Sequence, residues 1–437
     1  MIYSMFLTVS YGHANSYPLI LMSKLLKDNP VKLYLALDLG TTTLSGRLFA
    51  GSGEVLADYQ LANPQREEGA DILMRLQRAH EGAGGKLQDL IVEGLRVLIK
   101  KLLSLSGGSA SDVGSVVAAG NPGMSCLLQG LPVSSLLFPP HKPPCRELTF
   151  LPVEEVDIGM TEALHLFPLV SGFVGGDLVA CLLALPEVQP GTLLIDVGTN
   201  AELSLWDGTN WLVTSAAAGP AFEGGNVGSG MIMAEGAVTD VSLAGDRMQL
   251  SVAGGGPPRG LCGSGLAALV AAARQGGLID VTGRIRSAAE VETNLSRYLV
   301  ERQGSWVIRF YHDAHGELLL SQDDLRNFQL AKGAVRAGTE VLLDRGGFTS
   351  EGVSQVLVTG ALGTALPIEV LKRVALLPEA MLDKTSFIAN GVLAGLQAYL
   401  TSTDGQQRLA ELTNSMQAFP LSGTPAFERL FLTSLEF

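Results

Sequence analysis

Two stretches of the sequence, DLGTTTLSGRLF at residues 38–49 and DVGTNAELSLW at residues 196–206, follow the same pattern. In each, an apolar strand runs into an Asp-x-Gly-Thr turn and a second strand follows, which predicts antiparallel meanders over residues 32–60 and 192–214. Because the pattern occurs twice at a separation of about one lobe, we expect two similar halves that face each other. The fold class is therefore predicted as α/β, with a duplicated β meander plus helices.

Helices are predicted around the meanders. Apolar residues recur every three or four positions over residues 87–102, which is the stripe of an amphipathic helix. Ser321 and Asp324 offer a box-like cap to a helix over 323–343, and Gly346 and Gly347 end it. The remaining predicted elements are strands at 115–120 and from residue 354, helices over 177–185, 264–275 and 391–400, and an irregular excursion over 131–156.

The composition excludes several classes of protein. The 437 residues carry 43 acidic and 30 basic side chains, a formal net charge of −13, which disfavours nucleic acid or an anionic membrane as the main partner. Charged residues make up 17% and hydrophobic residues 47%, against roughly 25% charged residues in an average soluble domain. We therefore expect a large buried core rather than disorder.

The four cysteines, Cys126, Cys145, Cys181 and Cys262, are far apart and form no CxxC pair. Neither an iron–sulfur cluster nor a zinc knuckle can be written from them. So sparse a set is typical of reduced thiols in the core of a cytoplasmic protein.

The N-terminal segment lacks the features of a signal peptide, because its first basic residue is Lys24. We interpret residues 1–31 as a poorly ordered extension, with Met22 as an alternative start. The longest apolar stretch, at 168–186, is interrupted by Asp177 and three glycines, so we do not expect it to span a bilayer.

The first Asp-x-Gly-Thr turn has the chemistry of a phosphate site. Asp38 can hold Mg²⁺ through water, and Gly40 lets backbone amides approach a phosphate. Thr41, Thr42 and Thr43 supply hydroxyl donors. One such turn alone is also typical of a hairpin whose hydroxyls satisfy their own backbone.

The second turn repeats these residue types with Asp196, Gly198 and Thr199. Two such turns can clamp phosphates from opposite sides, which favours a nucleotide site over two unrelated hairpins. The pair resembles the phosphate-1 and phosphate-2 elements of the actin, sugar kinase and Hsp70 ATPase superfamily. That resemblance implies a two-lobed, actin-like (ribonuclease H-like) ATPase fold with ATP and Mg²⁺ in the cleft, Asp38 and Asp196 on the metal, and Asn200 among the nucleotide contacts.

The same resemblance assigns two further parts of the site. VLVTGALG at residues 356–363 falls where the superfamily has its adenosine loop, so Gly360 and Gly363 are expected against the ribose and adenine. A purely structural strand-to-helix turn is the alternative. Asp177 begins a helix that in the superfamily runs through the interlobe cleft, where a carboxylate can position or deprotonate the attacking water. Its alternative role is to interact with the helix dipole.

Other acidic and glycine-rich positions are secondary candidates. Glu202 and Glu223 are candidates for metal or water contacts. The loop AAGPAFEGG at 217–225 is interpreted either as a partner-facing or interlobe loop that exposes Phe222 and Glu223 together, or as a structural turn. Gly263 and Ser264, which follow Cys262 at a helix start, are candidates for nucleotide contact, while burial is the commoner state for that cysteine.

Longer stretches resemble the ATPase module of the reductive activators of corrinoid proteins. They cover most of residues 32–400 in order, and AGPAFEG with CGSG is the most specific part. The stretches are NPQREEGADILMRL from Asn63, AAGNPGMSCLLQGL from Ala118, SGFVGGD from Ser171, IDVGTNAEL from Ile195, AAGPAFEGGNVGSGM from Ala217, GLCGSGL from Gly260 and LAKGAVRAG from Leu330. The resemblance implies ATP-driven transfer of an electron onto the cobalt of an inactivated Co(II) corrinoid protein.

This sequence departs from the family pattern in its cysteines. Members of the family usually carry the electron on an iron–sulfur cluster in an attached domain or cysteine-rich segment, and no such cysteine set occurs at either end here. We therefore expect no iron–sulfur cluster and a separate low-potential electron donor. NPGM at 121–124 and TGALG at 359–363 also depart from the turns expected in the family.

The resemblance also divides the chain. Residues 32–190 are expected to form lobe I, residues 191–387 lobe II, and residues 388–437 a return helix and C-terminal tail. The sequence leaves monomer and homodimer both open. Two other functions of the same fold also remain open: a small-molecule kinase that uses Asp177 as base, and a nucleotide-gated scaffold.

Overall fold

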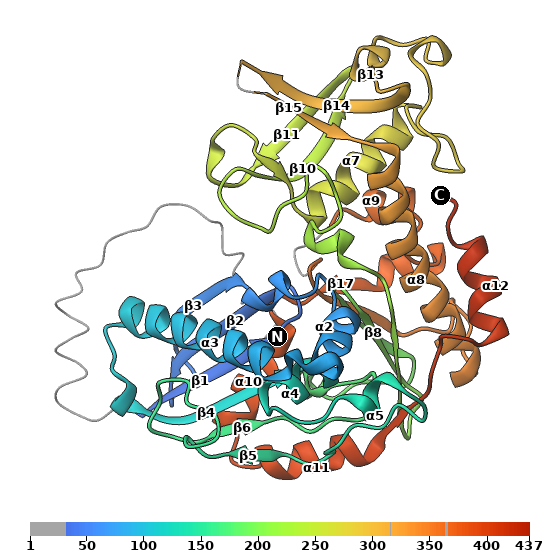
Figure 1. The fold of residues 1–437 in the computed structure, drawn as a ribbon. Coiled ribbons are helices and arrows are strands. Elements are labelled where there is room, and N and C mark those ends of the chain that lie inside the picture. The colour runs from blue at the N-terminus through green and yellow to red at the C-terminus, as the bar shows by residue number, and fades with distance from the viewer. Residues whose placement is uncertain (1–31, 315, 363–365) are drawn as a thin grey trace, which may run out of the picture.

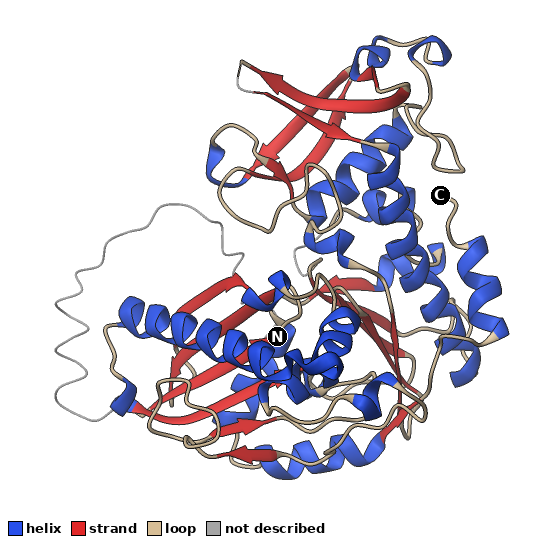
Figure 2. Ribbon diagram, in the orientation of Figure 1, coloured by secondary structure: helices blue, strands red, loops and turns tan. Residues whose placement is uncertain are grey.

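The computed structural model describes residues 32–314, 316–362 and 366–437. They form two lobes, each built on a six-stranded sheet with helices packed against it (Figures 1 and 2). The predictions for residues 1–31, Met22 included, lie outside the described residues.

The sheet of lobe I has the strand order β3-β2-β1-β4-β6-β5. Its first three strands form the predicted antiparallel meander, and β4 and β6 add to it in parallel. The strands are β1 (Leu33–Leu39), β2 (Thr43–Ala50), β3 (Val55–Ala62), β4 (Val113–Gly120), β5 (Thr149–Leu151) and β6 (Leu164–Leu166).

The sheet of lobe II repeats this plan in the order β17-β16-β7-β8-β9-β18. Strands β7, β8 and β9 form the second meander, and β16 and β17 join β7 in parallel, as β4 and β6 join β1. The strands are β7 (Thr192–Val197), β8 (Ala201–Trp206), β9 (Trp211–Ala216), β16 (Gln355–Gly360), β17 (Thr385–Phe387) and β18 (Met416–Ala418). This repetition confirms the predicted duplication.

The helices of lobe I cover its sheet. Helix α3 (Gly84–Ser106) packs on β2 and β3 with the predicted apolar stripe, every member of which is fully buried. Burying each of these side chains contributes about 1.5–3 kcal/mol relative to leaving it exposed. The other helices are α2 (Ile72–Arg78), α4 (Pro122–Leu128) and the single turn α5 (Ser134–Leu137), which interrupts the predicted irregular excursion.

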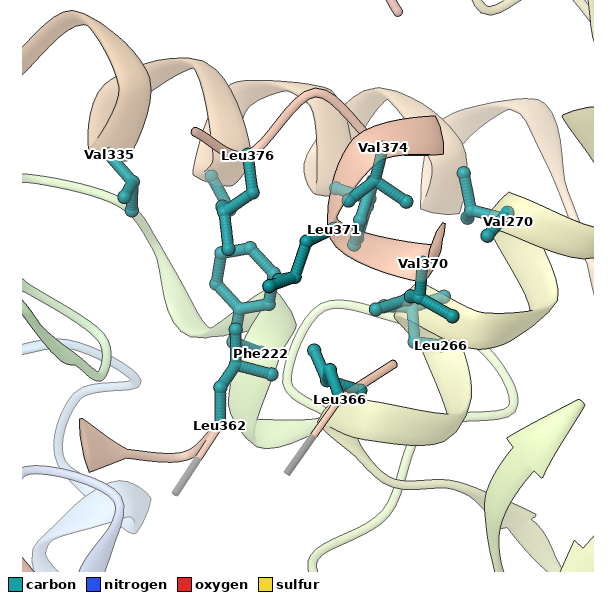
Figure 3. Packing of buried hydrophobic residues seen from close by; sticks show 14 of the residues in the cluster. Phe222, Leu266, Val270, Val335, Leu362, Leu366, Val370, Leu371, Val374 and Leu376 are labelled. Atoms are coloured by element: carbon teal, nitrogen blue, oxygen red, sulfur yellow. The ribbon is translucent and has the colours of Figure 1, made fainter. Parts of the chain in front are cut away.

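The helices of lobe II enclose its core. Helix α8 (Gln322–Gly346) begins with the predicted capping box of Ser321 and Asp324 and ends at Gly347, which has a left-handed φ of 73°. Helices α7 (Gly263–Gln275), α9 (Ile368–Arg373) and α12 (Pro425–Thr433) complete this layer. Figure 3 shows Leu266 of α7 and Val370 of α9 packed in one apolar cluster.

Two three-stranded sheets form a smaller part of the molecule above lobe II in Figure 1. One has the order β11-β10-β12, with β10 (Ala237–Ala244), β11 (Arg247–Val252) and β12 (Gly260–Leu261). The other has the order β13-β14-β15, with β13 (Leu299–Arg302), β14 (Ser305–Asp313) and β15 (Gly316–Leu320). No strand was predicted in this region from the sequence.

Two helices join the lobes. Helix α6 (Gly176–Leu183) and the return helix α10 (Gly391–Thr401) pack on each other, and α10 also contacts β1 and β4 of lobe I. A single apolar cluster includes Val117 of β4, Leu178 of α6, Leu194 of β7 and Leu396 of α10. The predicted C-terminal tail after α10 contains α11 (Gly405–Ser415), β18 and α12. Among the described helices, none combines the length and apolarity that crossing a bilayer requires.

Candidate active site

The two Asp-x-Gly-Thr turns follow the central strands of the two matching sheets. Asp38 is the second-last residue of β1 and lies opposite Ser45 of β2. Asp196 is the second-last residue of β7 and lies opposite Glu202 of β8. Because the two sheets have the same plan, equivalent strand ends carry equivalent carboxylates, as the repeated sequence predicts.

The two turns meet at their threonines. The side-chain oxygens of Thr42 and Thr199 lie 3.1 Å apart. Both hydroxyls donate to the same carboxylate oxygen, Oε2 of Glu223, at 2.7 Å from Thr42 and 2.5 Å from Thr199. Thr42 belongs to lobe I, and Thr199 and Glu223 belong to lobe II, so this hydrogen-bonded group ties the lobes at the predicted phosphate site.

Two asparagines hold the first turn in place. Asn63 donates from Nδ2 to the carbonyl of Gly40 at 2.9 Å, and Asn121 donates from Nδ2 to Oγ1 of Thr41 at 2.9 Å. Each asparagine also caps a helical segment, because its Oδ1 accepts a backbone N–H from Gln65 or Met124. One side chain thus fixes both a helix start and the phosphate-1 turn.

Three buried aspartates of the site have raised pKa values. The pKa of Asp38 is raised well above its ordinary value, first by burial and then by the charges of Asp177 and Asp196. Burial raises the pKa of Asp177 to about 6. Burial and the charge of Asp177 raise the pKa of Asp196 to about 7. Neighbouring carboxylates that cannot all ionise easily are a favourable environment for a bound cation.

Two glutamates extend this acidic group. The side chain of Glu202 is buried, and its pKa is raised well above the ordinary value by burial and by the charges of Asp177 and Asp196. Burial also raises the pKa of Glu223, although its hydrogen bonds from Thr199 and Thr42 act in the opposite direction. Both glutamates therefore lie in the same electrostatic environment as the three aspartates.

Asp177 lies in the first turn of α6, as predicted. Its Oδ1 accepts the N–H of Leu178 at 2.9 Å, which fits the alternative reading of a carboxylate that stabilises a helix start. Its charge nevertheless acts on Asp38 and Asp196, so the carboxylate lies beside the predicted metal ligands. Both roles are compatible with this position.

Gly360 lies against the second turn. It has a φ of +78°, and a side chain there would overlap Oδ1 of Asp196. The next residue, Ala361, donates its N–H to the carbonyl of Val197 at 2.6 Å. This position brings β16 close to the phosphate-2 turn, and contact of Gly360 with a nucleotide stays a prediction. Gly363 lies outside the described residues.

The loop at 217–225 differs from one of its two predicted forms. Phe222 is buried, with 1% of its surface exposed, and belongs to the apolar cluster of Figure 3, so the prediction that Phe222 and Glu223 are exposed together is wrong. Phe222 packs edge-to-face on Phe328 of α8 at 5.5 Å between ring centroids. The loop is a structural turn that turns Glu223 toward Thr42 and Thr199.

The start of α7 supports this turn. A side chain at Gly263 would overlap the carbonyl of Phe222, so only glycine allows the two backbones to approach this closely. The hydroxyl of Ser264 donates to the carbonyl of Thr239 at 2.9 Å, and Cys262 is buried. Nucleotide contacts from Gly263 and Ser264 stay predictions.

Two further residues predicted to contact the nucleotide, Thr43 and Asn200, have structural roles beside the turns. Thr43 is the first residue of β2 and pairs with Ala62 of β3. Asn200 shapes the second turn through its carbonyl, which accepts the N–H of Gly198 at 3.0 Å. Whether either contacts a nucleotide stays a prediction.

Several residues of the site were not singled out from the sequence. They are Asn63, Asn121, Arg75 and Cys181, whose Sγ lies 3.5 Å from Oδ2 of Asp196. The two asparagines had a readable signal, since each precedes a proline at a helix start. The other two depend on contacts between distant segments.

The described side chains do not by themselves make up a complete set of metal ligands. In the described ranges 32–314, 316–362 and 366–437, no group of three or more His, Cys, Asp or Glu side chains is arranged to hold a metal ion. Asp38 and Asp196 are hard oxygen ligands of the kind that Mg²⁺ uses together with water and phosphate oxygens. The donor set therefore fits Mg²⁺ that arrives with a nucleotide.

Models of two related protein regions match the chain. The model described as the C-terminal domain of RACo, the ASKHA domain, matches residues 191–437, which is more than half of the chain. The model of the RACo middle region matches residues 33–186.

Two curated relatives and a solved structure are also similar to this chain. The corrinoid activation enzyme RamQ of Eubacterium limosum is 28% identical over 86% of this chain and 65% of its own length. The [Co(II) methylated amine-specific corrinoid protein] reductase of Methanosarcina barkeri is 27% identical over 48% of this chain and 39% of its own length. The chain thus spans less than two thirds of either relative.

The solved structure is a reductive activator for corrinoid, iron–sulfur protein. It superposes with a TM-score of 0.87 and 27% sequence identity, and the match covers 94% of this chain and 67% of that chain. Together with the match to the ASKHA domain, this similarity confirms the two-lobed, actin-like fold predicted from the repeated turns.

Proposed function

Since the chain belongs to the RACo family, with the RACo middle region followed by the ASKHA domain, we propose that it is an ATPase that activates a corrinoid protein reductively. ATP and Mg²⁺ bind between the two lobes, and hydrolysis drives an electron onto the cobalt of the partner. RamQ is named a corrinoid activation enzyme and the Methanosarcina protein a corrinoid protein reductase, which supports this class of partner.

The single observation that carries the ATPase part is the contact between the turns. Thr42 and Thr199 come from the two copies of the Asp-x-Gly-Thr pattern, yet their hydroxyls share one oxygen of Glu223. Two unrelated hairpins have no reason to converge in this way. Two phosphate-binding turns do, because a polyphosphate between the lobes must contact both.

The carboxylates suit a metal–nucleotide complex. In this proposal Asp38 and Asp196 hold Mg²⁺ through water, and Mg²⁺ supplies charge neutralisation of the phosphates. Without a cation these carboxylates resist ionisation, as the pKa of about 7 for Asp196 indicates. The hydroxyls and backbone amides of the two turns bind the phosphates and hold them in position.

Asp177 is the proposed general base. It lies at the start of α6, which connects the two lobes, and burial raises its pKa to about 6. A carboxylate with a pKa near neutrality can accept a proton from water while remaining largely ionised at pH 7. Asp177 therefore orients the water that attacks the terminal phosphate and accepts its proton.

The electron comes from a separate low-potential donor in this proposal. Three of the four cysteines are buried on different elements, with Cys126 in α4, Cys181 in α6 and Cys262 before α7, while Cys145 is partly exposed. Iron analysis after anaerobic reconstitution with iron and sulfide tests this point. Stoichiometric bound iron would contradict it.

The proposed function is tested by ATP hydrolysis with the purified chain. We expect Mg-dependent hydrolysis that accelerates when a Co(II) corrinoid protein of the same organism is added. Phosphate transfer to a small-molecule acceptor, with no response to any corrinoid protein, would favour the kinase alternative and contradict the proposal. Absence of nucleotide binding would contradict both.

A further inference from the structure

Arg75 is a fully buried cation whose hydrogen bonding is incomplete. Its side chain is 0% exposed, although it projects from the short helix α2. Nε donates to the carbonyl of Gly69 at 2.9 Å, and Nη1 contacts Oε1 of Gln65 at 3.3 Å and Sδ of Met124 at 3.6 Å. Nη2 is buried without a hydrogen-bond partner among the described residues. Leaving a charged donor in this state is costly unless a ligand or partner uses it.

The guanidinium lies next to the residues that hold the phosphate-1 turn. Met124, which contacts Nη1 of Arg75, also lies 3.9 Å from Nδ2 of Asn63. Asn63 binds the carbonyl of Gly40, and Met124 donates its N–H to Asn121. Arg75 is therefore separated from the turn by one layer of side chains.

Arg75 also acts electrostatically on the opposite lobe. Burial, together with the charge of Arg66, lowers its pKa to about 10, so it stays charged at neutral pH, and the charges of Asp71 and then Glu223 act against that shift. Asp71 caps α2 by accepting the N–H of Met74 at 2.8 Å. No carboxylate in the described part of the chain forms an ion pair with Arg75, so no direct partner neutralises its charge.

The position of Arg75 indicates which part of a bound nucleotide its charge affects. Gly360, the predicted adenosine contact, belongs to lobe II, whereas α2 belongs to lobe I and lies on the side of lobe I that faces lobe II in Figure 1. A nucleotide held by its adenosine on lobe II reaches lobe I with its terminal phosphate. A cation in lobe I therefore acts on the triphosphate more than on the diphosphate.

We propose that Arg75 is a positioning residue that supplies the positive charge needed for the terminal phosphate of a nucleoside triphosphate to approach Glu223. This inference rests on the proposed nucleotide site and adds a basis for distinguishing ATP from ADP. Arg75 acts through Glu223 and the phosphate-1 turn.

The test compares two substitutions on the same helix. Arg75→Met removes the charge and keeps a similar apolar stem, while Arg78→Met removes an exposed arginine of α2. Calorimetry measures binding of a non-hydrolysable ATP analogue and of ADP to each variant and to the wild type. We expect Arg75→Met to weaken the triphosphate analogue by about 10- to 100-fold and ADP by less than about threefold, in line with the loss of a charge-assisted interaction. Arg78→Met should change neither.

Two further variants separate charge from packing. Arg75→Lys keeps the charge and should recover part of the lost affinity for the triphosphate. Glu223→Gln added to Arg75→Met removes the carboxylate that the arginine compensates, and should also recover part of it. An arginine that only supports the fold predicts neither recovery. If Arg75→Met does not fold, Arg75→Gln, which removes the charge and keeps polar donors, takes its place and decides the question through its ATP-to-ADP affinity ratio.

Equal losses for both nucleotides, or no recovery in either second variant, would overturn the role of Arg75. A wild-type chain that binds no nucleotide would instead overturn the proposed function on which the inference rests. The two failures are therefore distinguishable in one set of titrations.

Discussion

The side-chain oxygens of Thr42 and Thr199 lie 3.1 Å apart, although 157 residues separate them in the chain. Both hydroxyls donate to Oε2 of Glu223, so the three residues form one hydrogen-bonded group that crosses the lobe boundary. Because the shared oxygen can be satisfied by either hydroxyl, the two threonines should be energetically coupled.

A double-mutant cycle measures this coupling. Thr42→Val and Thr199→Val each remove one donor to Glu223, and we expect their effects on the free energy of unfolding to deviate from additivity by about 0.5–3 kcal/mol, the range for residues in one network. Urea unfolding of the wild type, both single variants and the double variant gives the coupling. Thr413, whose hydroxyl bonds only within α11, offers a control pair with Thr42 that should be additive. Additivity of Thr42 and Thr199 within about 0.5 kcal/mol would show that they act independently.

Loss of either metal-side carboxylate should abolish function. Asp38→Ala and Asp196→Ala each remove an oxygen ligand proposed for Mg²⁺, so we expect Mg·ATP binding or hydrolysis to be lost in both. Calorimetry and a phosphate-release assay measure these properties. Asp89→Ala, on the exposed side of α3, is the matched control and should behave as the wild type. Near-normal binding and turnover in both site variants would refute the assignment of these ligands.

Asp177→Asn should separate binding from hydrolysis. The amide keeps the shape of the side chain and can still accept the N–H of Leu178, but it cannot take a proton from water. We expect ATP affinity to persist and turnover to fall by about 10²- to 10⁴-fold, the range for a lost general base. Loss of folding instead would favour a purely structural role at the start of α6.

Local patterns in the sequence were sufficient to predict the parts of the fold that repeat. The Asp-x-Gly-Thr turns follow strands with a clear apolar pattern, and the stripe from Leu87 to Leu102 has helical spacing, so both predictions agree with the structure. The capping box at Ser321 has a fixed local spacing and was also predicted correctly. The strands from β10 to β15 were not predicted, since their pairing depends on tertiary contacts more than on local propensity.

The site was only partly predictable because its key contacts join distant segments. Thr42 and Glu223 are 181 residues apart, and no local pattern relates them. The burial of Phe222 depends on Phe328 of α8, which explains why the sequence left open both a loop that exposes Phe222 and the structural turn that is observed. The incomplete hydrogen bonding of Arg75 likewise becomes visible only when α2 and α4 pack together.

The stability of the ligand-free protein should fall as pH rises through neutrality. The folded-state pKa of Asp196, about 7, and of Asp177, about 6, lie above the ordinary value of 3.8. A raised pKa means that the folded state holds the proton more tightly, so this stabilisation is complete below about pH 4 and is lost as the pH rises through 6 and 7.

Thermal unfolding of the wild type and Asp196→Asn between about pH 5 and pH 8 measures this dependence. We expect the wild-type Tm to fall more steeply with pH than that of the variant, and the difference to shrink when Mg·ATP is present, because the bound cation offsets the carboxylate charges. A steeper fall in the variant, or parallel curves for the two proteins, would contradict the raised pKa of Asp196.

The most direct measurement is the visible spectrum of a Co(II) corrinoid protein from the same organism, followed under anaerobic conditions with Ti(III) citrate as the low-potential donor. We predict that the Co(II) band disappears rapidly only when the wild-type chain and Mg·ATP are both added, and that Asp196→Ala gives no acceleration. Equal rates with and without ATP for every corrinoid protein of the organism would contradict ATP-driven reductive activation.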